Sequence, residues 1–264
     1  MIGLNGGLLG AQRSTNTLTG PGVWVSNEQA LLRRANVWPR TDDPYSSNVS
    51  LLLHMDGSDG STTFTDNSTS ALSVTAYGNA QISTAQSQFG GASGYFDGTE
   101  DYLGVPDTNS GFAFGTGDFT MEWWFRSNAT NAYCAMVTRP YSGNGGILIS
   151  LNGATANGAP EIYWREWTNG LFFASSTGGY NDNAWHHFAF VRSGTTCYMF
   201  IDGVQRASKT GVSTSVGSSI LYVGDDREFA TRTYTGYIDE LRITKGVARY
   251  TAAFTPSTTA FPNP

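Results

Sequence analysis

Two acidic residues stand side by side near the C-terminus, in the segment YTGYIDELRITKGVARYTAAFTP. Asp239 and Glu240 lie in the middle of a strand-like run of apolar residues. Side chains alternate along a strand, which predicts that Asp239 and Leu241 face one side of a sheet and that Glu240 faces the other. Carboxylates on opposite faces cannot flank one substrate bond, so this pair does not predict paired acid and base catalysis.

Other residues with catalytic chemistry are sparse. Glu122 stands alone in FTMEWWFRS, and EIYWREW carries Glu161 and Glu166 without an Asp between them. His186 and His187 in WHHF are typical of a packed, hydrogen-bonded pair on a strand rather than of a base or a metal ligand. No arrangement of Ser, His and Asp stands out, and we predict that the chain is not an enzyme.

Aromatic and polar residues around EIYWREWTNG raise the question of sugar binding. Exposed Trp or Tyr rings cover the apolar faces of sugar rings at a low entropic cost. The candidates for such a platform are Trp164, Trp167, Tyr141 and Tyr180, with Arg165 and Asn169 as hydrogen-bond partners. The alternative for the tryptophans other than Trp167 is packing within the protein core.

Composition indicates the elements that position these residues. The chain has 264 residues with 32 Gly, 13% aromatic and 14% charged residues, a composition that favours strands and tight turns. From Val49 onward, short apolar or alternating runs are separated by Gly, Asn and Asp, as in a β-sandwich. Asp202 and Gly203 separate two such runs and predict a hairpin with a type I′ turn.

Charge and cysteine content exclude several classes of partner. The formal net charge of −6 and a pI near 5.0 leave no basic surface for nucleic acid. No apolar run is long enough to span a membrane. Cys134 and Cys197 each lie in an apolar run and are predicted to be buried free thiols, with a bridge between them as the alternative.

Residues 1–47 differ in character from the rest. A Gly-rich stretch precedes VSNEQALLRRANVWP, in which Ser26 and Gln29 form a capping-box pattern that predicts a short helix over about 27–37. A segment of this length cannot bury a core of its own. We expect an extended arm that is anchored on a partner through Trp24, Arg33, Arg34 and Trp38, with a disordered leader as the alternative.

Blocks from Val49 to Pro256 resemble the laminin-G-like branch of the concanavalin A-like lectin/glucanase superfamily. They are LLLHMDGSDGSTTFTDNS, FGGASGYFDGTEDYLGV, FGTGDFTMEWWFRS, NDNAWHHFAFVRSGTTCYMFIDGV and the segment around Asp239. The resemblance implies an all-β, two-sheet antiparallel jelly-roll sandwich over 48–258, followed by a tail at 259–264. The Glu-Asp-Glu cluster of the hydrolases of this superfamily is absent, which again argues against hydrolysis.

The same resemblance implies a structural Ca²⁺ at the junction of the first and last strands. The matching carboxylates are Asp56 and Asp239, with Asp97 as a third candidate. The alternative is that Asp239 accepts hydrogen bonds from backbone groups or Arg242, and that Asp56 and Asp97 are turn residues.

The leader and the LLLHMDG and ARYTAAFTP blocks resemble virion proteins of tailed bacteriophages. This resemblance implies a non-catalytic capsid decoration or cement protein, present in many copies or as a homo-oligomer, that docks on capsid or tail proteins through its arm and binds host glycans weakly. A tail-fibre or adhesin head and a secreted carbohydrate-binding module are the alternatives. No signal peptide is evident at Met1, which fits assembly in the host cytoplasm and a location in the virion.

Overall fold

The computed structural model describes residues 43–140, 145–152, 157–165, 171–175, 177–228 and 231–264. The chain divides into two units, 1–44 and 45–264, and the second unit holds all of the elements described below. The predicted helix over 27–37 and the predicted anchors Trp24, Arg33, Arg34 and Trp38 lie outside the described residues. Among the described residues, no helix is long and apolar enough to cross a bilayer.

The second unit consists almost entirely of strands, preceded by the 3₁₀ helix η1 (Ser46–Asn48). The strands are β1 (Val49–Leu53), β2 (Thr75–Tyr77), β3 (Gln81–Ser83), β4 (Ser93–Asp97), β5 (Tyr102–Val105), β6 (Phe119–Arg126), β7 (Cys134–Arg139), β8 (Gly146–Leu151), β9 (Glu161–Arg165), β10 (Leu171–Ala174), β11 (Trp185–Ser193), β12 (Thr196–Ile201), β13 (Val204–Lys209), β14 (Leu221–Val223) and β15 (Thr235–Lys245).

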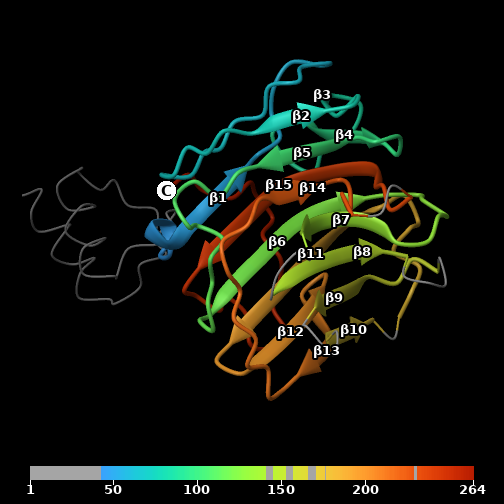
Figure 1. Ribbon diagram of the computed structural model, residues 1–264. Helices are drawn as coiled ribbons and strands as arrows, with labels where there is room; N and C mark the ends of the chain where they lie inside the picture. Colours follow the sequence, from blue (N-terminus) through green and yellow to red (C-terminus); the bar gives the residue numbers. More distant parts are fainter. Residues whose placement is uncertain (1–42, 141–144, 153–156, 166–170, 176, 229–230) are drawn as a thin grey trace, which may run out of the picture. The chain divides into compact units, whose positions relative to one another are not determined.

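The strands form two antiparallel sheets that pack face to face (Figure 1). Sheet A has the order β13-β12-β11-β6-β15-β4-β3, with β1 also paired to β15. Sheet B has the order β10-β9-β8-β7-β14-β5-β2. The first and last strands are therefore neighbours, as the sequence predicts, and the all-β two-sheet sandwich is confirmed.

One large apolar core fills the space between the sheets. It includes Trp123 and Phe188, whose rings stack with centroids 4.6 Å apart, and Trp164, which is fully buried. Cys134 and Cys197 are both free and buried in this core, as predicted. Burial raises the pKa of each thiol to about 12, which keeps both thiols protonated and unreactive at neutral pH.

The predicted hairpin between β12 and β13 is confirmed by its backbone geometry. Asp202 has a φ of 52° and Gly203 a φ of 74°, as a type I′ turn requires. The Asp202 carboxylate also accepts a hydrogen bond from the His187 amide at 2.8 Å and contacts Nδ1 of His186 at 2.8 Å. The predicted packing of the two histidines as a hydrogen-bonded pair on a strand is thus confirmed.

The predicted alternation around Asp239 is wrong, because β15 contains a β-bulge. Asp239 pairs with Trp124 and Arg242 with Glu122, so two residues of β15 stand opposite one residue of β6. Glu240 occupies the extra position with a φ of 51°. Leu241 consequently points into the core, whereas Asp239, Glu240 and Arg242 all lie on the outer side of sheet A.

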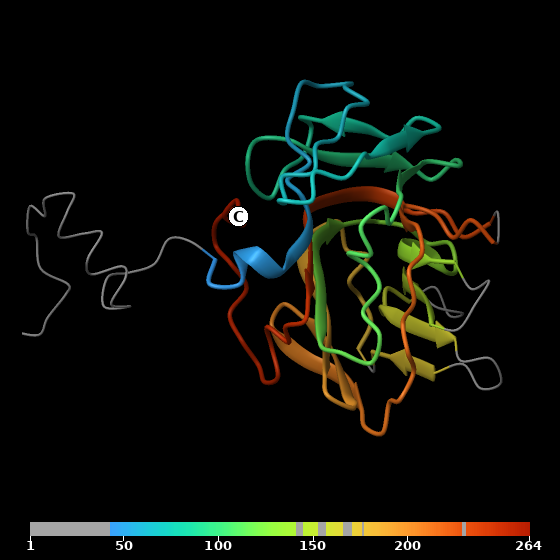
Figure 2. The ribbon, with the colours of Figure 1, turned by 60° about the vertical axis from the view of Figure 1, so that its left-hand side comes forward.

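The C-terminal segment after β15 runs back over the outer side of sheet A (Figure 2). Tyr250 and Phe254 stack on each other with centroids 3.6 Å apart and pack against Phe200 of β12. Phe261, which the sequence places in a separate tail, is buried against Val49 and Leu52 of β1. The jelly roll therefore includes this segment.

Candidate functional site

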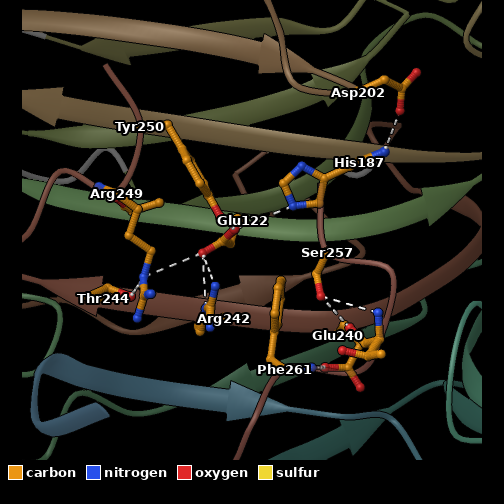
Figure 3. A network of polar contacts seen from close by, with 12 residues as sticks. Glu122, His187, Asp202, Glu240, Arg242, Thr244, Arg249, Tyr250, Ser257 and Phe261 are labelled. Atoms are coloured by element: carbon orange, nitrogen blue, oxygen red, sulfur yellow. Dashed lines mark hydrogen bonds and ion pairs between the residues drawn. The ribbon is translucent and has the colours of Figure 1, made fainter. Parts of the chain in front are cut away.

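A buried polar network closes the outer side of sheet A (Figure 3). One carboxylate oxygen of Glu122 accepts hydrogen bonds from Nε and Nη2 of Arg242 at 3.0 and 2.8 Å. Its other oxygen accepts a hydrogen bond from the Tyr250 hydroxyl at 2.8 Å and lies 3.4 Å from Nε2 of His187. Arg249 approaches the first oxygen at 3.6 Å.

These partners determine the ionisation of Glu122. Burial alone would raise its pKa, but Arg242, His187 and Arg249 outweigh burial and lower the pKa to about 2. Glu122 is therefore a permanent anion at neutral pH that joins β6 to the C-terminal segment. Such a carboxylate has no proton to donate, and its oxygens are occupied by protein donors.

A second contact fixes the end of the C-terminal segment to the bulge of β15. Glu240 accepts a hydrogen bond from the Phe261 amide at 2.8 Å and contacts Nδ1 of His54 at 2.8 Å. Nε2 of His54 lies 2.9 Å from Oδ1 of Asn263. The guanidinium of Arg242 covers the Phe261 ring, with Cζ 3.7 Å from its centroid. The C-terminal segment thus covers the part of sheet A around β1, β6 and β15.

Three tyrosines lie on the outer side of sheet B, of which Tyr77 is exposed and Tyr102 and Tyr222 are half-buried. Leu103 and Val105 of β5 and Leu221 and Val223 of β14 point into the core, so the residues between them point outward. Tyr77 of β2, Tyr102 of β5 and Tyr222 of β14 gather on this outer side. We call these three residues, together with Arg227, the tyrosine face.

The rings of the tyrosine face pack closely. Tyr77 and Tyr102 stack with centroids 4.4 Å apart and an angle of 10° between planes, and Tyr222 meets Tyr102 edge-on at 5.7 Å. Tyr77 is 45% exposed. Gly104 lies under the rings, where an added Cβ would be 3.3 Å from Tyr77 and 3.9 Å from Tyr222. Glycine at this position lets the rings lie directly over the strand.

The loop after β14 supplies a cation to the tyrosine face. Cζ of Arg227 lies 4.3 Å from the centroid of the Tyr102 ring, and Nη1 lies 3.4 Å from Oδ2 of Asp225. Asp225 is 1% exposed, and burial raises its pKa to about 6 although Arg227 opposes the shift. The buried Asp225 thus orients an Arg227 guanidinium that remains 39% exposed.

A flanking cluster lies across sheet B on β9 and the loop before β7. Tyr133 and Tyr163 have centroids 5.9 Å apart, and Cζ of Arg232 lies 4.5 Å from the Tyr133 ring. The strand register places Tyr222, Thr138, Leu148 and Tyr163 in one row. Three strand spacings separate Tyr222 from Tyr163 by roughly 14 Å. Thr138 and Leu148 between them are buried, so the two aromatic clusters are distinct patches.

The chemistry of the tyrosine face is that of a stacking and hydrogen-bonding surface. Tyr rings present flat apolar area with a hydroxyl at the edge, and Arg227 adds exposed N–H donors. A planar or ring-shaped polar ligand with an apolar face matches this combination.

A comparison with known protein families identifies the family of this chain. The family model described as the concanavalin A-like lectin/glucanases superfamily matches residues 97–249. The chain belongs to this superfamily. The predicted family is therefore confirmed.

Solved structures share the concanavalin A-like fold at low sequence identity. The binding domain of paraclostridial mosquitocidal protein 1 is 15% identical with a TM-score of 0.60, and the match covers 77% of this chain and 50% of that chain. Domain 4 of a GH43 extracellular arabinanase from Geobacillus stearothermophilus, in complex with arabinotriose, is 16% identical with a TM-score of 0.58, covering 76% and 94%. The binding domain of botulinum neurotoxin serotype D is 15% identical with a TM-score of 0.58, covering 78% and 50%.

The chain spans about half the length of the two toxin binding domains. None of the curated proteins matches the chain significantly. At these identities the solved structures establish the fold.

Two of the six sugar-binding residues predicted from the sequence, Trp164 and Tyr180, are described in this concanavalin A-like sandwich, and both are buried. Trp164 is fully buried in the core, where it contacts Phe119 and Phe190, and Tyr180 is 7% exposed. Neither ring offers a face for stacking, and the alternative of core packing holds for Trp164. Tyr141, Trp167, Asn169 and the Arg165 side chain lie outside the described residues.

Sequence reasoning missed the tyrosine face. Its residues are separated in the sequence and come together only through the pairing of β2 with β5 and of β5 with β14. The available signal was strand alternation: YLGV and LYV each place a Tyr or Gly between two apolar residues that point into the core.

The three carboxylates predicted to hold calcium separate into two groups. Burial raises the pKa of Asp239 to about 7, and the nearby carboxylates of Glu240 and Asp56 add smaller upward contributions. Asp97 instead accepts hydrogen bonds from the Thr99 amide at 2.8 Å and from Asn79 at 3.2 Å. Asp97 is the last residue of β4, and these hydrogen bonds join it to the turns that contain Thr99 and Asn79.

One feature of the surroundings of Asp239 fits a bound cation, and another does not. Oδ2 accepts hydrogen bonds from the amides of Gln88 and Phe89 at 2.8 and 3.1 Å, while Oδ1 is buried without a hydrogen-bond partner. An unpartnered buried oxygen beside further carboxylates is a chemical fit for Ca²⁺. Within the described ranges, no group of three or more His, Cys, Asp or Glu side chains is arranged to hold a metal.

Proposed function

We propose that this chain is a non-catalytic binding module that recognises glycans through the tyrosine face. The stacked pair of Tyr77 and Tyr102, edged by Tyr222 and capped by Arg227, carries the proposal. Sugar rings pack their apolar C–H faces on such rings while Arg227 donates hydrogen bonds to their hydroxyl groups. The arabinotriose complex of a structurally similar domain supports a glycan as the ligand class.

The absence of catalysis is part of this proposal. Asp225, the carboxylate beside the tyrosine face, pairs with Arg227, and Glu122 on the other sheet is ion-paired and covered. A single weak site is useful when many copies act together, since multivalent display raises the effective affinity.

Binding to a panel of immobilised oligosaccharides that includes arabinotriose tests this proposal. The full-length chain is compared with the variants Tyr102→Ala and Tyr222→Ala. Tyr95→Ala is the matched control, because the Tyr95 ring lies against that of Tyr237, with centroids 5.0 Å apart, on the outer side of sheet A. We expect loss of binding in the first two variants and full binding in the control. Equal binding by all three variants, or no glycan bound by the wild-type chain, would refute the proposal.

We also propose that a calcium ion stabilises the junction of β1 and β15. Asp239 and Asp56 would hold it, with backbone oxygens completing the oxygen shell that Ca²⁺ prefers. The ion would neutralise the carboxylates that gather there, and its role would be structural.

The place of this module on a phage particle is a separate proposal that rests on the sequence resemblance. Residues 1–47 would dock on capsid or tail proteins, and the sandwich would be displayed outward as a decoration or cement protein. Electron cryo-microscopy of the particle tests the location, and mass measurement of the isolated chain tests the alternative of an oligomeric tail-fibre head. An arm that contacts several shell subunits supports decoration, whereas an arm wound with copies of itself refutes it.

A further inference from the structure

An open polar pocket of about 440 Å³ lies at the C-terminal end of β15. Four segments line it: η1 and the start of β1, the loop at 69–70, the turn at 109–111, and Lys245 with Gly246. The size falls in the range of pockets that bind small molecules.

The pocket carries one positive charge. Lys245 is the charged residue among those that line it, and no carboxylate belongs to this set of described residues. Nζ of Lys245 donates a hydrogen bond to the carbonyl oxygen of Ser110 at 2.8 Å. An ammonium group has three N–H donors, so two remain for a ligand. Lys245 thus gives the pocket a local positive charge in a chain whose net charge is −6.

The remaining lining groups are neutral donors and acceptors. Hydroxyl groups come from Ser47, Ser50, Thr69, Ser70 and Ser110, and amides come from Asn48 and Asn109. Side chains of this kind hydrogen-bond to the hydroxyls of a sugar ring.

Hydrogen bonds between distant segments fix the walls in place. Nδ2 of Asn48 donates to the carbonyl oxygen of Lys245 at 3.0 Å, and the Ser50 hydroxyl donates to that of Ile243 at 3.4 Å. Oδ1 of Asn109 accepts from the Gly111 amide at 3.1 Å and closes the turn that presents the Ser110 carbonyl to Lys245. The site is therefore organised before a ligand arrives.

The pocket and the tyrosine face are separate sites. Lys245 ends β15, whereas Thr235 at the other end of this strand follows the loop that carries Arg227. An eleven-residue strand spans roughly 30 Å. A ligand in the pocket does not reach the loop of Arg227 unless it is an extended oligosaccharide.

We propose that this pocket binds one anionic sugar residue, with the acidic group on Lys245 and the ring hydroxyls on the serine, threonine and asparagine side chains. The charge of the ligand resides on a carboxylate or a sulfate ester. This proposal rests on the pocket alone and does not depend on glycan binding at the tyrosine face.

The test is a titration of the ¹⁵N-labelled full-length chain followed by amide chemical shifts, with affinities from calorimetry. The probes are D-glucuronate, D-glucose 6-sulfate, neutral D-glucose and inorganic sulfate. We expect one or both anionic sugars to shift the amides of Ser110, Gly111 and Gly246. The relative affinity of the first two probes identifies the acidic group.

Two variants and one control locate the site. Lys245→Gln removes the charge, and Thr69→Trp fills the pocket from an exposed position. Each should weaken binding at least about tenfold, as expected for loss of a charge-assisted hydrogen bond or of the space itself. Lys209→Gln removes an exposed lysine of β13 and should leave the affinity unchanged.

Four results would overturn the proposal. Glucose binding as tightly as the anionic sugars contradicts the role of charge, and inorganic sulfate binding as tightly contradicts recognition of the ring. Shifts confined to residues outside the pocket contradict the location. No binding of either anionic sugar at millimolar concentration contradicts the site altogether.

Discussion

Nε and Nη2 of Arg242 both donate hydrogen bonds to Oε1 of Glu122, at 3.0 and 2.8 Å, across neighbouring strands of sheet A. Both side chains are almost completely buried, with exposures of 6% and 0%. The C-terminal segment covers this pair with Arg249, Tyr250 and Phe261. The segment shields the ion pair from solvent, and the ion pair in turn provides contacts that hold the segment on the sheet.

Removing Arg242 leaves the buried Glu122 carboxylate without its closest cation, and the remaining partners Tyr250, His187 and Arg249 compensate its charge only in part. We expect Arg242→Met to lower the free energy of unfolding by about 3 to 5 kcal/mol. Urea unfolding followed by tryptophan fluorescence measures the loss. Arg126→Met is the control, because Arg126 at the end of β6 hydrogen-bonds to Asn183 at an exposed site. If the two variants lost the same free energy of unfolding, the buried Glu122–Arg242 ion pair would contribute no more than an exposed arginine.

Acid stability should depend on the same carboxylate. The pKa of Glu122 is about 2 in the folded chain and near 4.5 when unpaired, so unfolding takes up a proton between these values. The stabilisation is present above pH 4.5 and is lost as the pH falls toward 2. Glu122→Gln should therefore flatten the dependence of the unfolding free energy on pH in this window. A variant with the wild-type slope would contradict the assignment.

The tyrosine face depends on the absence of a side chain at Gly104. A methyl group there would press on the Tyr77 ring at 3.3 Å, and a larger side chain would displace it. We expect Gly104→Val to weaken glycan binding by about tenfold while the fold persists, because the added atoms point away from the core. Surface plasmon resonance with the best oligosaccharide from the panel measures the effect. Unchanged affinity would show that stacking on Tyr77 is not used.

Much of the sandwich is predictable because its signals are local. The turn at Asp202 and Gly203 follows from two residues that tolerate positive φ, and apolar runs such as that of β11 identify central strands. The bulge at Glu240 has no such signal. Its partners, His54 and Phe261, lie 186 residues before it and 21 residues after it, and a glutamate at positive φ is not favoured by its own chemistry.

The difference between local signals and contacts of distant segments also explains which binding residues could be predicted. Trp164 and Trp167 are close together in sequence, which suggests a cluster, but strand alternation points Trp164 into the core. Tyr102 and Tyr222 are 120 positions apart in the printed sequence and meet only because β14 pairs with β5. Pairing between strands so distant in sequence is set by the topology and cannot be read from local patterns.

The end of the C-terminal segment should behave as part of the fold. Phe261 buries its ring against Val49 and Leu52 and lies under the Arg242 guanidinium. We expect Phe261→Ala to lower the free energy of unfolding by about 3 kcal/mol, the lower part of the range for a buried Phe. Phe254→Ala tests the middle of the same segment. Limited proteolysis should release a C-terminal peptide from both variants before the protease cleaves the strands. Variants as resistant to the protease as the wild-type chain would contradict the docking of this segment.

Calcium provides the last prediction, and Asp97 supplies its control. If Ca²⁺ joins β1 to β15, adding millimolar calcium should raise the melting temperature by several degrees, roughly what about 1 to 2 kcal/mol of binding energy gives. EDTA should reverse the gain. Asp239→Asn replaces the oxygen that is buried without a partner and should abolish the response. Asp97→Asn should keep it, because the Asp97 carboxylate already accepts hydrogen bonds from Thr99 and Asn79. A calcium response that persists in Asp239→Asn would show that the ion binds at another site. If the wild-type chain shows no response, the calcium proposal is wrong, and Asp239 is held only by the hydrogen bonds from the amides of Gln88 and Phe89.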